Sequence, residues 1–275
     1  MTTLAQRASA IPPVGQLLRE WRERRRISQL DLSIQADISA RHLSFVETGR
    51  SRPTSGMILR LSEQLDVPLR ERNALLLAGG YAPAYPEHSL DEPELNRLRA
   101  ALRQILTGHE PYPALVINRW WEILDGNAAV AVLTEGCDPA LLTPPLNALR
   151  VSLHPDGMAP RIANLSEWRA HILERLHRQV QSTRDPRLAE LHAELSAYPG
   201  GLAERPGLTD VAVPLRIRHA DRELAFFSMT AVVGAPLDVT VAEVAIESFY
   251  PADAETAEAL HKIGVSERAD APAAR

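Results

Sequence analysis

The sequence predicts two domains, an all-α domain of five helices followed by a larger α+β domain with an antiparallel sheet. The length of 275 residues suits two domains of ordinary size. Apolar residues recur at helical spacing from residue 14 to residue 78, whereas short β-rich segments occur only in the later part of the chain. A segment with Pro83 and Pro86 separates the two patterns and predicts a linker.

The first domain is predicted at 14–80, with helices at about 14–25, 29–36, 40–48, 56–65 and 69–78. Gly79 and Gly80 end the last helix, since glycine readily adopts the left-handed conformation that closes a helix. Residues 1–13 are small and polar and are predicted to be disordered. The linker is expected at 81–92.

The second domain is predicted at 93–263, with a disordered tail at 264–275. Five strands are expected, two early in the domain and three late, with helices between them. The expected strands lie at 114–117, 121–124, 211–218, 223–233 and 239–249, and the expected helices at 94–106, 127–133, 166–180 and 186–196. A sheet interrupted by helices in this way indicates a PAS-like sensor, in which the sheet cups an apolar pocket.

The net charge of −5 is divided unevenly along the chain. Residues 1–85 contain 12 Arg and 8 acidic residues, a balance of +4, so the remainder carries −9. This division favours nucleic-acid binding by the first domain, although ordinary variation in composition also produces such a difference.

Other features of composition exclude several classes of protein. The single cysteine, Cys137, excludes an intrachain disulfide and a cysteine-based zinc site, and leaves a redox switch or an inert apolar side chain. No apolar run approaches the roughly 20 residues that span a bilayer. The first ten residues do not resemble a signal peptide, so we expect a cytoplasmic protein that does not associate with membranes.

No pattern in the sequence predicts catalysis. It contains no nucleophile elbow, no phosphate-binding loop and no metal-binding pair of histidines on one helix. His171 and His177 are six residues apart and do not share a helix face. We therefore expect a protein that is not an enzyme and has no catalytic residue, metal site or cofactor.

Residues 28–50 have the pattern of a helix-turn-helix. Ser33 and Ala36 are small enough for two helices to cross closely, and Asp37 stands where a left-handed residue is expected. Ser39 is placed to cap the second helix. The apolar contacts between the helices are assigned to Leu32, Ile38, Leu43 and Val46.

The second helix of this pair presents a candidate DNA-reading face. With Leu43 and Val46 inward, helical periodicity places Ala40, Arg41, Ser44 and Phe45 on the opposite side. In this motif that helix enters the major groove, where Arg41 can bind guanine and Phe45 can contact a thymine methyl. The alternatives are a solvated charge for Arg41, and core packing or a dimer contact for Phe45.

The same residues resemble the lambda-repressor-like, XRE-type helix-turn-helix family, whose pattern is met by Ser28, Gln29, Leu32, Ser39, Glu47, Gly49 and Pro53. The resemblance implies that Gln29 contacts a DNA phosphate and that Arg22 and Glu47 form a structural ion pair. By position, Arg50 and Arg52 suit further phosphate contacts that set register. The Arg24–Arg26 run is better explained as solvated charge at a helix C-terminus.

A second resemblance covers about residues 14–262 and is carried by Arg41–Pro53, Leu69–Pro83, His154–Asn164, Pro236–Thr240 and Ile246–Asp253. These segments are similar to those of the MmyB-like regulators. The resemblance implies an XRE-type domain joined to a PAS-like ligand-binding domain, with a fatty-acid-like ligand.

Six residues are candidates for that ligand site. Tyr112, Trp121 and Phe227 are apolar candidates, and His154, Arg161 and Asn164 are candidates for holding a carboxylate. Core packing explains the aromatic residues equally well, and loop pinning explains the polar ones.

Together these patterns predict a transcriptional regulator that binds double-stranded DNA as a homodimer and responds to a small apolar or fatty-acid-like effector. The alternative is an autoregulating, antitoxin-like protein whose second domain binds a partner protein. An enclosed pocket would favour the effector, and an exposed apolar patch would favour the partner.

Overall fold

The computed structural model describes residues 12–201 and 212–270. The chain divides into two compact units. The first runs through His88 and also contains residues 235–242, and the second contains residues 89–234 and the chain from Glu243 onward. Most of the disordered segment predicted at 1–13 lies outside the described residues, as do the last five residues of the predicted tail.

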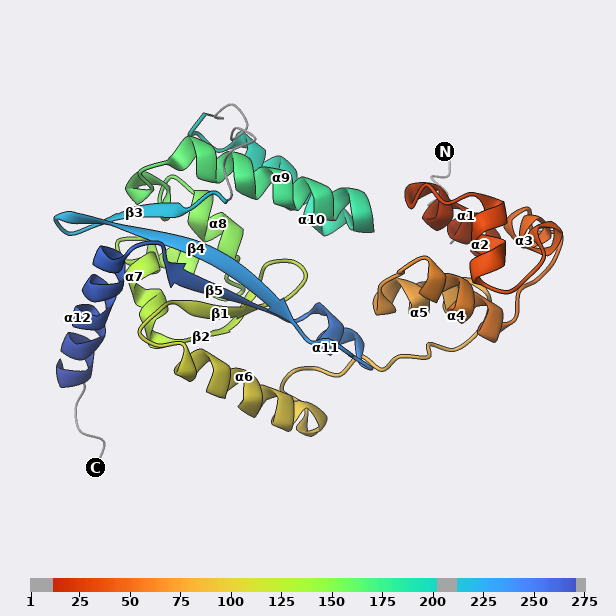
Figure 1. Ribbon diagram of the computed structural model, residues 1–275, viewed down its shortest axis with the longest axis horizontal. Helices are drawn as coiled ribbons and strands as arrows, with labels where there is room; N and C mark the ends of the chain where they lie inside the picture. The colour runs from red at the N-terminus through yellow and green to blue at the C-terminus, as the bar shows by residue number, and fades with distance from the viewer. Residues whose placement is uncertain (1–11, 202–211, 271–275) are drawn as a thin grey trace, which may run out of the picture. The chain divides into compact units, whose positions relative to one another are not determined.

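The N-terminal unit contains the five helices that the sequence predicts, within about two residues at each end. They pack around a core that includes Leu18, Leu43 and Leu61. The helices are α1 (Val14–Arg24), α2 (Gln29–Gln35), α3 (Ala40–Glu47), α4 (Ser55–Gln64) and α5 (Leu69–Ala78) (Figure 1).

The chain beyond α5 does not leave the N-terminal unit at residue 81, where the sequence predicted the linker to begin. The Tyr81 hydroxyl donates a hydrogen bond to the Pro53 carbonyl at 3.0 Å. The Asn73 side-chain oxygen accepts hydrogen bonds from the amides of Ala84 and Tyr85. These bonds satisfy backbone groups of an irregular segment, so the unit boundary lies after His88.

The C-terminal unit is built on a five-stranded antiparallel sheet of order β2-β1-β5-β4-β3. Strand β1, which lies between β2 and β5, is buried along its whole length, as its continuous apolar sequence predicts. The strands are β1 (Ala114–Ile117), β2 (Ile123–Gly126), β3 (Leu215–His219), β4 (Arg222–Val232) and β5 (Ala245–Pro251). The α+β architecture with an antiparallel sheet predicted from the sequence is confirmed, with two early and three late strands.

The two faces of the sheet have separate cores. Ala114, Val116 and Ile246 pack against Leu102 and Leu106 of α6 on one face. The opposite face packs against the remaining helices of the unit and forms the larger core. The helices of the unit are α6 (Asn96–Gly108), α7 (Ala131–Thr134), α8 (Ala148–Leu153), α9 (Leu165–Thr183), α10 (Pro186–Ala197), α11 (Val239–Glu243, partly in the first unit) and α12 (Ala254–Asp270) (Figure 1).

The strands predicted at 121–124 and 211–218 begin later, at Ile123 and Leu215, and residue 211 lies outside the described residues. Two further predicted elements differ in type or length. Residues 239–243 form helix α11 rather than the start of a strand, because the Asp238 side chain accepts a hydrogen bond from the Val241 amide and caps a helical turn. Helix α12 continues to Asp270, so the tail predicted to begin at 264 is helical over its first residues. Ala259 and Leu260 anchor this helix in the larger core.

The connection between β4 and β5, residues 235–242, belongs to the N-terminal unit. Asp238 accepts a hydrogen bond from the His88 amide at 3.1 Å, and its Oδ2 lies 2.8 Å from His88 Nδ1. The Val239 amide donates to the Pro86 carbonyl. Burial raises the pKa of Asp238, but the bonds from His88 and nearby amides outweigh it and lower that pKa.

Candidate functional site

Helices α2 and α3 form a helix-turn-helix with the local geometry expected from the sequence. Asp37 has a φ of 52° and forms the left-handed turn between them. The Ser39 side chain accepts a hydrogen bond from the His42 amide and caps α3. Ser33 and Ala36 are buried where the two helices cross.

The outward face of α3 carries a cation stacked on an aromatic ring. Arg41 is exposed, and its guanidinium carbon lies 5.4 Å from the centre of the partly buried Phe45 ring. Ala40 and Ser44 are partly exposed, whereas Leu43 and Val46 are buried. The predicted face therefore presents Arg41 at its surface with Phe45 beneath it.

A buried ion pair joins α1 to α3. Arg22 Nε and Nη2 donate hydrogen bonds to the two Glu47 oxygens at 2.7 and 2.9 Å. The hydrogen bond with Glu47 raises the pKa of Arg22 against the lowering effect of burial. Arg22 also donates to the Ile27 carbonyl, which closes the loop between α1 and α2.

The predicted phosphate ligands have different surroundings. Gln29 Nε2 donates one hydrogen bond to Glu47 at 2.7 Å, which leaves its second amide hydrogen for a phosphate. Arg50 is exposed. Arg52 donates to the Gly79 carbonyl at the end of α5, and Arg25 donates to the Leu65 and Asp66 carbonyls after α4, so both have structural roles within this unit.

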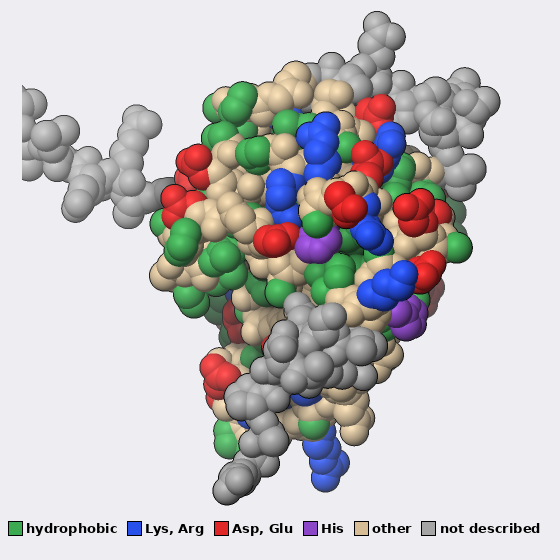
Figure 2. Space-filling view, turned by 90° about the vertical axis from the view of Figure 1, so that its left-hand side faces the viewer, with side chains coloured by type: hydrophobic (Ala, Val, Ile, Leu, Met, Phe, Trp, Pro, Cys, Tyr) green, Lys and Arg blue, Asp and Glu red, His purple; other side chains and the backbone are tan. Residues whose placement is uncertain are grey.

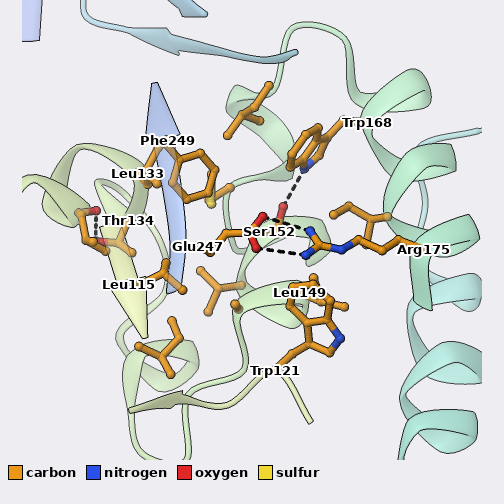
Figure 3. Close-up of a pocket in the computed structure, with 17 residues that line it drawn as sticks. Leu115, Trp121, Leu133, Thr134, Leu149, Ser152, Trp168, Arg175, Glu247 and Phe249 are labelled. Atoms are coloured by element: carbon orange, nitrogen blue, oxygen red, sulfur yellow. Dashed lines mark hydrogen bonds and ion pairs between the residues drawn. The ribbon is translucent and has the colours of Figure 1, made fainter. Parts of the chain in front are cut away.

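The C-terminal unit contains an apolar cavity of about 60 Å³ between the sheet and helices α7, α8 and α9 (Figure 3). Trp168, Ile172 and Arg175 follow one face of α9 at helical spacing and form one wall. The other lining residues are Leu115, Trp121, Ile123, Val130, Leu133, Thr134, Ala148, Leu149, Val151, Ser152, Met158, Leu215, Glu247 and Phe249.

An ion pair stands at one side of the cavity. Arg175 donates two hydrogen bonds to the Glu247 carboxylate, at 2.9 and 3.0 Å (Figure 3). Thr230 donates a third to Glu247 at 2.8 Å. The Arg175 guanidinium lies 4.4 Å from the Trp121 ring centre, so the cation is stacked as well as paired. The Glu247 side chain is only 7% exposed.

A second polar group lies on α8. The buried Ser152 hydroxyl accepts a hydrogen bond from Trp168 Nε1 at 2.9 Å (Figure 3). Within residues 12–201 and 212–270, the Ser152 hydroxyl donates no hydrogen bond of its own. This hydroxyl therefore retains a donor at the cavity wall.

Only one of the six ligand-site residues predicted from the sequence lines the cavity. Trp121 lines it. Phe227 lies in an open groove between α9 and β4. Tyr112 contacts His109 and His261 by ring edges, and His154 contacts Tyr198.

The two remaining predicted residues hold loops. Asn164 bonds the Pro214 carbonyl and the Arg216 amide, and so connects the start of α9 to β3. Arg161 donates to the Val132 and Leu133 carbonyls at the end of α7. These placements match the loop-pinning alternative, because each side chain is engaged with backbone groups.

Sequence reasoning missed Arg175, Glu247 and Ser152. The signal for Glu247 was present in β5, since alternation places residues 247 and 249 on one face and Phe249 is an obvious core residue. Its partner is 72 residues away in sequence, and periodicity within α9 does not identify that pairing. Burial raises the pKa of the Cys137 thiol despite Arg161 nearby, which favours the inert interpretation.

Comparison with known families is decisive for the C-terminal unit. A family described as the MmyB-like transcription regulator ligand binding domain matches residues 98–263. The chain belongs to the MmyB-like transcription regulators. A helix-turn-helix domain family matches residues 13–75. This MmyB-like chain thus combines a helix-turn-helix with a ligand-binding domain.

The remaining comparisons add little to this family assignment. No curated protein matches this MmyB-like chain. Among solved structures, an RNA-binding light-oxygen-voltage receptor aligns at 12% identity with a TM-score of 0.27. The alignment covers 93% of this chain and 62% of the receptor chain, and a TM-score this low carries no argument. Within the part of the chain that the structure describes, no helix is long and apolar enough to span a bilayer.

Proposed function

We propose that this MmyB-like regulator binds specific double-stranded DNA through α3 and that a small molecule in the C-terminal cavity controls its affinity for DNA. The observation that carries the proposal is the apolar cavity in a unit of the ligand-binding family, within the same chain as a helix-turn-helix. Such cavities, with a few placed polar groups, are typical of small-molecule sites.

The DNA-bound form that we propose is a homodimer. Helix-turn-helix modules usually read inverted repeats whose half-sites lie one helical turn, about 34–36 Å, apart. Arg41 and Phe45 would read base edges, while Gln29 and Arg50 would contact phosphates. Ser39, Ala40 and Ser44 complete the candidate surface, and the competing bond to Gly79 gives Arg52 a smaller part in phosphate binding.

The mechanism that we propose is a shift between two conformations of the dimer. The chain itself offers a route, because β5 carries the lining residues Glu247 and Phe249 while the segment before it, residues 235–242, lies in the N-terminal unit. An effector that favours one arrangement of β5 would change the spacing of the two recognition helices.

The first experiment is native mass spectrometry of freshly purified protein, followed by extraction of any bound molecule. DNA affinity is then measured by fluorescence anisotropy, with and without that molecule, at low and moderate salt. We expect a removable adduct that changes DNA affinity, and a steep loss of affinity with salt. A regulator that binds DNA with no salt dependence would contradict the DNA part of the proposal.

A second candidate function is binding of a partner protein, as in antitoxin-like regulators. Apolar side chains are exposed on the C-terminal half of β4 and just beyond it. Among them, Met229 is 62% exposed and Val232 is 68% exposed. A different face of the molecule, seen in Figure 2, carries cationic and anionic side chains interspersed. A pull-down in which Met229→Glu abolishes capture of a protein would favour this candidate over a small molecule.

A further inference from the structure

We propose that the cavity selects an uncharged, largely apolar effector with one hydrogen-bond acceptor, and that it discriminates against carboxylates. This inference rests on the proposed function, because it assigns the effector to the same cavity. It departs from the fatty-acid-like ligand expected from family resemblance, and the reason is the charge arrangement in this chain.

The polar side of the cavity is already neutral. Arg175 and Glu247 are the only charged residues among those that line it. Their two hydrogen bonds align both groups, and Thr230 supplies Glu247 with a third. A ligand carboxylate in this apolar space therefore meets only a cation that is already paired with a counter-charge.

An anionic ligand has to compete with Glu247 for Arg175. Displacing Glu247 leaves its buried carboxylate with the Thr230 hydrogen bond but without a counter-charge, which is among the most costly arrangements in a protein interior. Sharing Arg175 instead places two carboxylates against one guanidinium, and like charges repel strongly where water is scarce. Stacking of Arg175 on Trp121 also holds the cation in its present place.

Neither Arg178 nor His171, the two nearby basic residues of α9, offers a substitute. Arg178 is 69% exposed and does not line the cavity. His171 stacks on Trp168, and burial, assisted by Arg175 and Arg178, lowers the pKa of its imidazole against the opposing effect of Glu247. At neutral pH His171 therefore supplies no positive charge.

Ser152 provides the specific contact for a neutral ligand. Its hydroxyl is oriented by the bond from Trp168 and keeps its own proton for an acceptor on the ligand. The apolar walls contact the remainder. The cavity volume of about 60 Å³ limits the effector to a small molecule, such as a short alkyl chain with one oxygen.

The test compares hexan-1-ol with hexanoate, which differ in charge but share a chain length. Binding to the full-length wild-type protein is measured by isothermal titration calorimetry at pH 7.5. We expect hexan-1-ol to bind about tenfold tighter or more, since hexanoate must disrupt the ion pair of the buried Glu247 carboxylate. Equal or tighter binding of hexanoate would overturn the inference while leaving the cavity as an effector site.

Glu247→Gln tests the same point in the opposite direction, because it leaves the Arg175 charge without its carboxylate partner. We expect this variant to gain affinity for hexanoate by about tenfold. Glu223→Gln is the matched control, since Glu223 also pairs with an arginine on the same sheet but is exposed and does not line the cavity. The control should keep the wild-type preference, and an identical gain in both variants would contradict the role of Glu247.

Ser152→Ala tests the contact that the inference assigns to the ligand oxygen. Hexan-1-ol affinity should fall by about fivefold to tenfold, with hexanoate still the weaker ligand. If neither hexan-1-ol nor hexanoate binds the wild-type protein in titrations that extend to millimolar concentrations, both the inference and the cavity assignment fail. The wild-type comparison decides the matter even if Glu247→Gln does not fold.

Discussion

At the scale of single residues, the two candidate sites use cations in opposite ways. Arg41 is exposed on α3 and stacks on Phe45, so its guanidinium edge remains free to meet a base. Arg175 is paired with Glu247 and stacked on Trp121, so its charge is satisfied within the protein. The first arrangement suits recognition of an anionic polymer, and the second suits a neutral ligand.

Arg41→Ala and Gln29→Ala should separate base reading from phosphate contact. Loss of Arg41 should cost about 1–3 kcal/mol on the preferred operator and relax specificity at one base pair. Loss of Gln29 should weaken binding to all sequences about equally. The measurement is anisotropy across an operator library in which one base pair changes at a time. A uniform loss for Arg41→Ala would remove its assigned role, and thermal melting must first show that Gln29→Ala still folds.

His171 predicts a pH dependence of stability. Because the pKa of His171 is lowered in the folded protein, the unfolded chain binds its proton first as pH falls below about 6.5. The free energy of unfolding should therefore be fully present above that pH and decline below it.

His192, whose pKa is also lowered by burial and by His177, adds to this decline. Urea unfolding at pH 7.5 and pH 5.5 should show a smaller difference for His171→Gln and the smallest for the double variant with His192→Gln. An unchanged difference in the double variant would show that other groups cause the decline.

At the scale of elements, Glu47 holds the helix-turn-helix together. It lies at the end of α3 and accepts hydrogen bonds from Arg22 of α1 and Gln29 of α2. Its side chain is 1% exposed. The orientation of the recognition helix thus depends on a polar contact shared by three helices, in addition to the apolar core.

Glu47→Gln should lower the free energy of unfolding by about 3–5 kcal/mol, because Arg22 is left buried without its counter-charge. Glu87→Gln is the matched control, since Glu87 forms a largely exposed pair with Arg70 in the same unit and should cost at most about 1 kcal/mol. Urea unfolding followed by circular dichroism measures both. Equal costs would show that burial of the Arg22 pair does not matter.

At the scale of the whole molecule, the two units are not strictly consecutive in the chain. Residues 235–242 leave the C-terminal unit after β4, join the N-terminal unit and return at β5. The hydrogen bonds between Asp238 and His88 fix this segment within the N-terminal unit. Strand β5 carries Glu247 at the cavity. The chain shortly before this strand belongs to the N-terminal unit, so β5 links the cavity to that unit along the chain.

Asp238→Asn should therefore weaken communication rather than ligand binding. An allosteric effector typically changes affinity by about 5-fold to 150-fold, and this change in DNA affinity should shrink toward unity in the variant. Hexan-1-ol affinity should stay at the wild-type value. Asp221→Asn in the exposed turn between β3 and β4 is the control. Full communication in Asp238→Asn would exclude this contact as the route.

The sequence by itself determined the five helices, the strand set and the helix-turn-helix geometry at Asp37 and Ser39. These features depend on interactions within a few residues, namely periodicity, capping and turn conformation. The family resemblance likewise indicated the domain pair that the comparisons identify.

Only the tertiary structure decided the ligand cavity and the unit boundary. Arg175 meets Glu247, and His88 meets Asp238, across long stretches of chain, and no local pattern encodes such pairings. Aromatic and polar residues that looked suitable, such as Tyr112 and Arg161, were used elsewhere because nearby rings and backbone carbonyls engaged them. Whether a buried charge is available to a ligand depends on which side chain folding brings beside it, and that is a property of packing.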